Sequence, residues 1–218
     1  MEPGFEAHVQ AFWEKNRNFI LLACVAVLLA IAGREGWQYF SALRENGVRE
    51  EYAKVSDQPE RLIAFAEANS GHPLAAVAYL QVADQKFGAA DYKQAAALYT
   101  KAAGGLKNEV LLGRAKLGAA ISQISGGEKA AGESALKALG SDPSLLKAVR
   151  AEATYHLASL AYEAGNTEEV KKLLGEITKI ELNGAWAQRA TMLLASLQAG
   201  GKATDAPAGG LNFKPGGE

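Results

Sequence analysis

The chain has 218 residues, and its 23 lysines and arginines nearly balance its 24 aspartates and glutamates, leaving a formal net charge of −1. A nucleic-acid-binding surface would show a clustered basic excess, which this composition lacks. The single cysteine, Cys24, excludes a disulfide within these residues.

The first predicted element is an uncharged apolar block at residues 19–33. A helix needs about 20 apolar residues to cross a bilayer, so this block is too short by itself. It becomes long enough when it is extended to residues 18–40. Trp13, Trp37 and Tyr39 then fall in the two headgroup regions, where aromatic side chains are enriched. We therefore expect a transmembrane helix over residues 18–40.

Two alternatives remain open for the apolar block. Lys15 and Arg17 before it, and the sequence Ala30-Ile31-Ala32 near its end, are typical of a cleaved signal peptide. A helix buried in a protein core is the other alternative. The uncleaved anchor is favoured because no helix-breaking residue precedes the cleavage sequence and the helical pattern continues beyond it. Basic residues lie on both sides of the block, so charge alone does not set its orientation.

Residues 1–17 and 41–57 flank the expected span. In the first segment, Phe5, Val9 and Phe12 recur at helical spacing, as in a short amphipathic helix that lies on a membrane surface. An amino-terminal extension of the transmembrane helix is the alternative. Residues 41–57 are expected to form a helical stalk.

Residues 58–199 predict helical hairpins. In a frame of about 34 residues that starts at Ala76, small residues occupy the eighth and twentieth positions, Ala83 and Ala95. Small residues there allow the two helices of a hairpin to approach closely. Asp91 is the expected N-cap of the second helix.

Two further units start at residues 111 and 151, with Gly118 and Ala158 at their eighth positions. We therefore expect an all-α fold, with one amino-terminal transmembrane helix followed by a tetratricopeptide-like α-solenoid of about three to four helical hairpins. A plain alanine-rich helical bundle is the alternative.

The repeat region has an expected boundary on each side. Pro59 opens an incomplete unit upstream, and residues 186–197 form a final helix that covers the last hydrophobic face. Residues 200–218 have the glycine and proline content of a linker, so we expect a disordered tail. Leu211 and Phe213 could form a short docking motif within it.

The order of these elements resembles the bacterial ancillary SecYEG translocon subunit family. The resemblance covers residues 8–197 and is strongest over residues 8–103, which include the amphipathic lead, the apolar block and the first repeat. It implies an inner-membrane protein with a cytoplasmic amino-terminus and a periplasmic repeat domain. The domain would sit beside the translocon and pass emerging chains to periplasmic chaperones. The glycine-rich second repeat departs from the family's usual pattern.

The sequence indicates no catalytic or cofactor chemistry. His8, His72 and His156 are too scattered to form a metal site, and we expect His156 at a solvated or groove-edge position. The glycine pairs at 104–105 and 126–127 lack the order of a phosphate-binding loop. We therefore predict that the protein is not an enzyme and that it has no metal, cofactor, small-molecule substrate or nucleic-acid partner.

Protein binding would use the concave surface lined by the first helix of each hairpin. A mixed apolar and aromatic groove suits extended or partly unfolded segments. The alternative for Leu80, Phe87 and Tyr155 is that they only pack between repeats. The candidate groove residues, which share positions facing this hollow, are Leu80, Asp84, Phe87, Glu152, Tyr155, Ser159, Tyr162, Trp186 and Arg189.

The expected function follows from the anchor and the groove together. We expect a single-pass bacterial inner-membrane protein whose periplasmic domain binds translocon subunits, periplasmic chaperones or client chains and assists Sec-dependent translocation. One alternative is a scaffold for envelope or cell-division machinery. Another is a secreted soluble repeat protein cleaved after Ala32.

Overall fold

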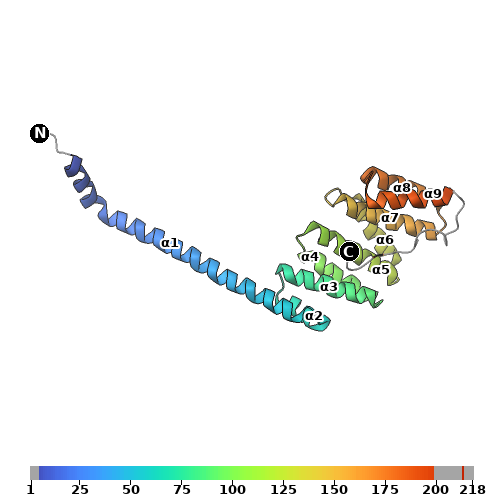
Figure 1. Ribbon diagram of the computed structural model, residues 1–218, viewed down its shortest axis with the longest axis horizontal. Helices are drawn as coiled ribbons and strands as arrows, with labels where there is room; N and C mark the ends of the chain where they lie inside the picture. The colour runs from blue at the N-terminus through green and yellow to red at the C-terminus, as the bar shows by residue number, and fades with distance from the viewer. Residues whose placement is uncertain (1–4, 199–212, 214–218) are drawn as a thin grey trace. The chain divides into compact units, whose positions relative to one another are not determined.

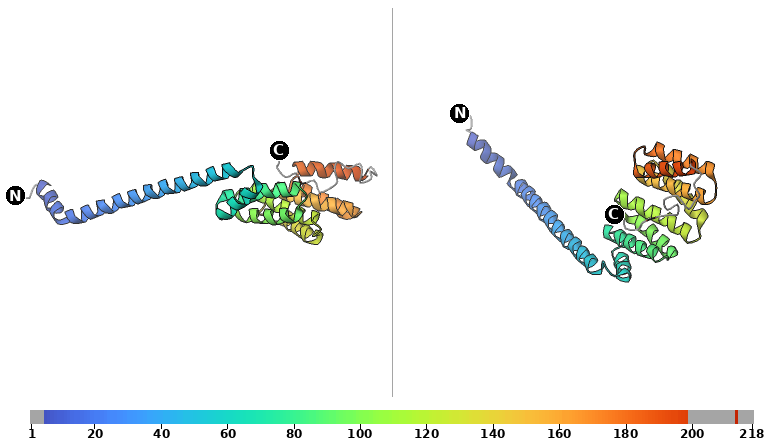
Figure 2. Two further views of the ribbon diagram at one scale, coloured as in Figure 1. Left: turned by 90° about the horizontal axis from the view of Figure 1, so that it is seen from below. Right: turned by 45° about the vertical axis from the view of Figure 1, so that its right-hand side comes forward.

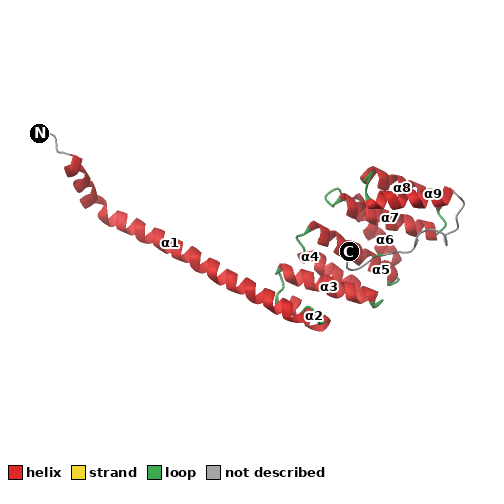
Figure 3. Cartoon of the chain, viewed as in Figure 1, coloured by secondary structure: helices red, strands yellow, loops and turns green. Residues whose placement is uncertain are grey.

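The computed structural model describes residues 5–198 and Phe213. Within these residues every regular element is an α-helix and no strand occurs (Figure 1, Figure 3). The chain divides into two units, Met1–Glu51 and Tyr52–Glu218. The expected all-α fold, with an apolar amino-terminal helix and repeated helical pairs, is confirmed. Apart from Phe213, the expectation of disorder in residues 200–218 lies outside the described residues.

The first unit consists of the greater part of helix α1 (Phe5–Val55). Its most apolar 18-residue window has a mean hydropathy of 2.0, and none of it is buried. Within the described part of the chain, α1 is the one helix long and apolar enough to cross a membrane by length and composition. A core helix would be buried, so the alternative of a helix buried in a protein core is wrong. A cleaved signal sequence can be as long and as apolar as this helix, so that alternative stays open.

Helix α1 begins at Phe5 and runs without interruption through the apolar block. The amphipathic lead and the apolar block are therefore parts of one helix. Figure 2 shows that its first turns bend away from the direction of the rest.

The second unit is built from helical pairs joined by short turns (Figure 2). After the single helix α2 (Pro59–Ala68), the chain forms three pairs and then closes with one helix, α9 (Ala185–Gln198). The pairs are α3 (Pro73–Gly88) with α4 (Tyr92–Gly105), α5 (Glu109–Ser125) with α6 (Lys129–Ser141), and α7 (Lys147–Glu163) with α8 (Thr167–Ile180). Each pair coincides with one of the three units expected from the sequence.

The contacts between helices give the stack its inner and outer layers. Helix α3 contacts α5, α5 contacts α7, and α7 contacts α9, whereas α4, α6 and α8 do not contact one another within the described residues. The first helices of the pairs therefore lie closer together than the second helices. A stack that is narrower on one side curves toward that side, so α3, α5, α7 and α9 form the inner layer.

Local sequence signals set the ends of these helices. The Asp91 carboxylate accepts a hydrogen bond from the Gln94 backbone N–H and caps α4, as expected. Asn166 caps α8 in the same way. Gly165, in the preceding turn, has a φ of 74°, in the left-handed region that favours glycine.

The repeats approach closely where the sequence places a glycine. Tyr99 of α4 is fully buried, with 0% of its surface exposed, and its ring lies over Gly118 of α5. A Cβ atom at Gly118 would come within 2.7 Å of Cζ of this ring, well inside normal contact distance. The sequence predicted a small residue here for close approach within one hairpin, whereas the nearest neighbour of Gly118 is the tyrosine of the preceding repeat.

We predict that Gly118→Ala destabilises the domain by about 1–3 kcal/mol, because the added methyl group displaces the Tyr99 ring or separates α4 from α5. Gly175→Ala is the matched control, since nothing lies within 4 Å of a Cβ at this interior position of α8. The control should gain about 0.5–1 kcal/mol from its better helix propensity. Urea unfolding followed by circular dichroism measures both changes. Equal stability of Gly118→Ala and the wild type would contradict the packing.

Candidate functional site

The candidate groove residues all lie on the inner layer, on α3, α7 and α9. Two of them are closed off from solvent, because Leu80 is 4% exposed and Ser159 is 2% exposed. The Ser159 hydroxyl donates a hydrogen bond to the Tyr155 carbonyl oxygen at 3.1 Å. Leu80 and Ser159 thus pack within the stack, and the more accessible side chains form two separate clusters.

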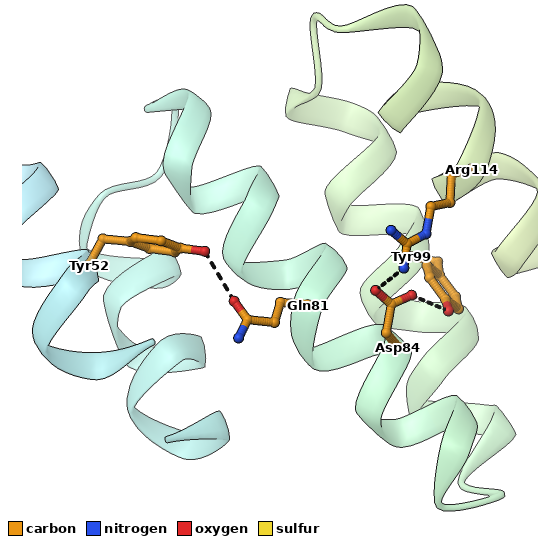
Figure 4. A network of polar contacts seen from close by, with 5 residues as sticks. All are labelled: Tyr52, Gln81, Asp84, Tyr99 and Arg114. Carbon is orange, nitrogen blue, oxygen red and sulfur yellow. Dashed lines mark hydrogen bonds and ion pairs between the residues drawn. The ribbon is translucent and has the colours of Figure 1, made fainter. Parts of the chain in front are cut away.

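Asp84 stands at the centre of the first cluster and joins three helices (Figure 4). The Tyr99 hydroxyl donates to Asp84 Oδ1 at 2.7 Å, and Arg114 Nη2 of α5 donates to Asp84 Oδ2. Burial raises the pKa of the Asp84 carboxyl, and the bonds from Tyr99 and Arg114 oppose this shift. Because both carboxylate oxygens are engaged, Asp84 connects two repeats and presents no free anion to a ligand.

A second polar contact fixes the start of the domain to α3. The Tyr52 hydroxyl donates to Gln81 Oε1 at 3.0 Å (Figure 4). The Gln81 side-chain amide in turn donates to the Ser56 carbonyl oxygen at 2.7 Å. These bonds hold the segment before α2 against the inner layer.

Aromatic rings gather beside the Asp84 cluster. Phe87 of α3 and Tyr92 of α4 meet edge to face, with ring centroids 5.3 Å apart. Phe213 lies against Phe87 at 5.3 Å and against Tyr99 at 5.9 Å, again edge to face. Such arrangements are preferred by aromatic pairs. We call the site formed by Phe87, Tyr92 and Tyr99 the aromatic pocket.

The other cluster lies on α7 and α9. The rings of Tyr155 and Trp186 are 5.2 Å apart, and the Arg189 guanidinium carbon lies 4.3 Å from the centroid of the Trp186 ring. This distance is typical of a cation–π interaction. Burial raises the pKa of Tyr155, and the positive charge of Arg189 opposes the shift. The cluster offers a rigid aromatic surface with a cation at its edge.

The expectation of a solvated or groove-edge His156 is wrong. The side chain is 2% exposed, and neither ring nitrogen has a hydrogen-bond partner within the described residues. Glu152 Oε1 lies 3.8 Å from Nε2, beyond hydrogen-bond distance. The physical reason is α9, whose Trp186 ring lies 5.9 Å from the imidazole and covers it. His72 caps α3, with Nδ1 accepting a hydrogen bond from the Leu74 backbone N–H at 3.1 Å.

A pocket of about 440 Å³ lies away from the candidate groove, between α6, α7 and α8. Its apolar lining includes Leu157, Leu160 and Leu173. Charged residues of both signs surround it, including the ion pair between Lys172 and Glu169 at 3.3 Å. This pocket was not predicted from the sequence, because helices of two different repeats line it.

The described part of the chain contains no group of three or more His, Cys, Asp or Glu residues that could hold a metal ion. The groups with shifted pKa values in these two clusters, Asp84, Tyr99 and Tyr155, are held by packing and hydrogen bonds. The two clusters thus present aromatic and apolar side chains on the inner layer.

A family model described as a tetratricopeptide repeat-like domain matches residues 10–153. The matched range begins before the apolar block and ends in α7, so it contains both the apolar helix and the first two helical pairs. Neither the curated proteins nor the solved structures give a match.

We predict that Tyr99→Phe lowers the free energy of unfolding by about 1.5–3 kcal/mol at pH 7, because Asp84 loses a hydrogen bond while the ring contacts remain. Burial and the bond to Asp84 raise the pKa of Tyr99 in the folded state. The stabilising effect of the hydroxyl is therefore complete below about pH 10, the ordinary tyrosine pKa, and declines above it as the unfolded chain ionises.

Urea titrations from pH 7 to 11 test this difference. Tyr92→Phe is the control, since the Tyr92 hydroxyl makes no hydrogen bond within the described residues, and it should change stability by less than about 0.5 kcal/mol. A Tyr99→Phe variant as stable as the control at every pH would contradict the proposed linkage.

Proposed function

Since the chain belongs to the tetratricopeptide repeat-like domain family, we propose that it is a membrane-anchored protein-interaction domain that binds extended segments of other proteins. Helical repeats of this kind generally mediate contacts between proteins, and the fold is typically not enzymatic. The family model matches residues 10–153, a range that contains both the apolar helix and the first repeats. This supports the proposal that the apolar helix and the repeats act together in one protein.

The observation that carries this proposal is the set of half-buried aromatic side chains on the inner layer, Phe87, Tyr155, Tyr162 and Trp186. Aromatic residues and arginine dominate the binding energy of protein interfaces, since they bury a large area with few rotatable bonds. Here Arg189 stands over one of these rings.

The electrostatics of the groove favour an uncharged part of a partner. Tetratricopeptide receptors that clamp a terminal carboxylate use a lysine and asparagines at the fifth, ninth and sixth positions of the repeat. Here Leu80 and Asp84 occupy the fifth and ninth positions of the first unit, and Ala115 and Lys116 occupy the fifth and sixth positions of the second, so this set is not supplied. Asp84 is further committed to Tyr99 and Arg114. A segment recognised through apolar and aromatic side chains fits this surface better than an acidic peptide terminus.

We further propose that the partners are chains emerging from the Sec translocon, which the domain passes to periplasmic chaperones. The resemblance of residues 8–103 to the ancillary translocon subunit family supports this proposal, as do the length and apolar composition of α1. The amino-terminus would be cytoplasmic and the repeat domain periplasmic in a bacterial inner membrane.

Photocrosslinking in native membranes tests the proposal. A benzophenone amino acid placed at Tyr162, on the inner layer, should give adducts with translocon subunits or translocating chains. The same probe at Glu168 is the matched control, since this side chain is 85% exposed on α8 of the same repeat. We expect adducts at position 162 that are several-fold more abundant than at position 168. Equal labelling at both positions, or adducts restricted to unrelated scaffold proteins, would contradict the proposal.

The anchor is tested on the same membranes. After carbonate washing, the chain should remain in the pellet and should retain residues 19–33. A soluble product that begins at Gly33 would show that the apolar block is a cleaved signal peptide.

A further inference from the structure

Phe213 is the described residue that lies beyond the last helix, 15 positions after Gln198. Its side chain is only 7% exposed, so it is as well buried as much of the helical core. It contacts α3 through Phe87 and α4 through Tyr99, far from α9 in the sequence. A residue from the carboxyl-terminal segment thus lies in the first complete repeat.

The geometry of this contact is specific. The Phe213 ring meets Phe87 at an interplanar angle of 77° and Tyr99 at 85°, with centroid distances of 5.3 Å and 5.9 Å. Both are edge-to-face contacts, in which the positive edge of one ring meets the negative face of another. Aromatic or large apolar side chains therefore suit this position, and a small polar side chain would lose both edge-to-face contacts.

The walls of the aromatic pocket are held by interactions that do not involve Phe213. Tyr99 is fixed between Gly118 and Asp84, and Phe87 packs against Tyr92. The pocket is therefore expected to keep its shape when Phe213 leaves. A preformed pocket can accept a side chain from another polypeptide without first paying the cost of ordering its walls.

We infer that the aromatic pocket is a binding site for an aromatic side chain of an extended segment, and that Phe213 of the same chain occupies it and competes with partners. The occupancy stands on the ring contacts alone, whereas the competition rests on the proposed peptide-binding function. Phe213 would prevent weak ligands from binding, and it would be displaced by segments of other proteins that make additional contacts along the inner layer.

Because Phe213 is attached to the same chain as the aromatic pocket, its effective concentration determines how strongly it weakens the binding of a partner. A tethered segment reaches effective concentrations on the order of 1 mM. If the same segment bound in trans with a Kd of about 0.1 mM, the tether would weaken its binding to the wild-type chain about ten-fold. Removal of the Phe213 ring should release this inhibition.

The probe for the test is a fluorescein-labelled peptide with the sequence of residues 207–217, measured by fluorescence anisotropy against the full-length chain in nanodiscs. We expect it to bind the Phe213→Ala chain about ten-fold more tightly than the wild type. Leu182→Ala removes a comparable apolar side chain that is 75% exposed, and should behave as the wild type. A peptide with alanine in place of the phenylalanine should bind neither chain measurably.

A double variant, Phe213→Ala with Phe87→Ala, locates the binding. It should lose the affinity gained by Phe213→Ala, because one wall of the pocket is missing. Circular dichroism verifies that both variants keep the helical fold.

Three results would overturn the inference. They are equal binding to the wild type and Phe213→Ala, no binding to Phe213→Ala, or inhibition in the wild type that grows with chain concentration, which would place Phe213 of a second copy in the pocket. None of these depends on adducts at Tyr162. The proposed function can thus fail or stand separately from this site.

Discussion

The close packing of Tyr99 on Gly118 is the constraint on which the rest of the domain depends. The ring is fully buried, and the absence of a side chain at residue 118 lets α5 approach it. From this position the hydroxyl reaches Asp84 on α3, which in turn binds Arg114 on α5. One tyrosine therefore links the two helices of its own repeat to the first helix of the next. The same ring presents an edge-to-face contact to Phe213, so repeat packing and the candidate binding site share a residue.

This arrangement explains how the domain can keep a binding surface that does not disturb its core. Asp84 is a charged residue on the inner layer, but its charge is balanced by Arg114 and its oxygens are engaged. Removal of Asp84 or of Arg114 alone would leave the other as a half-buried charge without compensation, which is costly. The side chains proposed to contact a partner are aromatic rings whose positions are fixed by neighbouring rings, as for Phe87 beside Tyr92 and Trp186 beside Tyr155. Under the proposed function, such a surface would select partners by the spacing of aromatic side chains more than by their charge.

The features that the sequence predicted well are local ones. Small residues at Ala83, Gly118 and Ala158 recur with the repeat, and the helical pairs follow them because close approach needs small side chains. The N-cap at Asp91 depends only on the next three residues, so it was predicted from the sequence alone. The apolar block likewise stands out by composition over a single window.

The features that were missed depend on residues far apart in the chain. Asp84 was placed in the groove by its position in the repeat, and its partner Arg114 lies 30 residues later in another repeat. His156 is covered by Trp186 of α9, a helix outside the repeat frame. The pocket between α6, α7 and α8 is lined by helices of two different repeats, so no single repeat encodes it. For Phe213, the sequence offered a short apolar motif and no indication of where it would bind.

The central claim is that the aromatic pocket holds the ring of Phe213 while the protein is free, and a fluorine probe reports this directly. With 4-fluorophenylalanine incorporated only at position 213 of the full-length chain, the ¹⁹F resonance should be displaced from that of an exposed ring by the currents of Phe87 and Tyr99. Replacement of Phe87 by alanine should move it toward the exposed value. A resonance already at the exposed value, and unchanged by the replacement, would contradict the account.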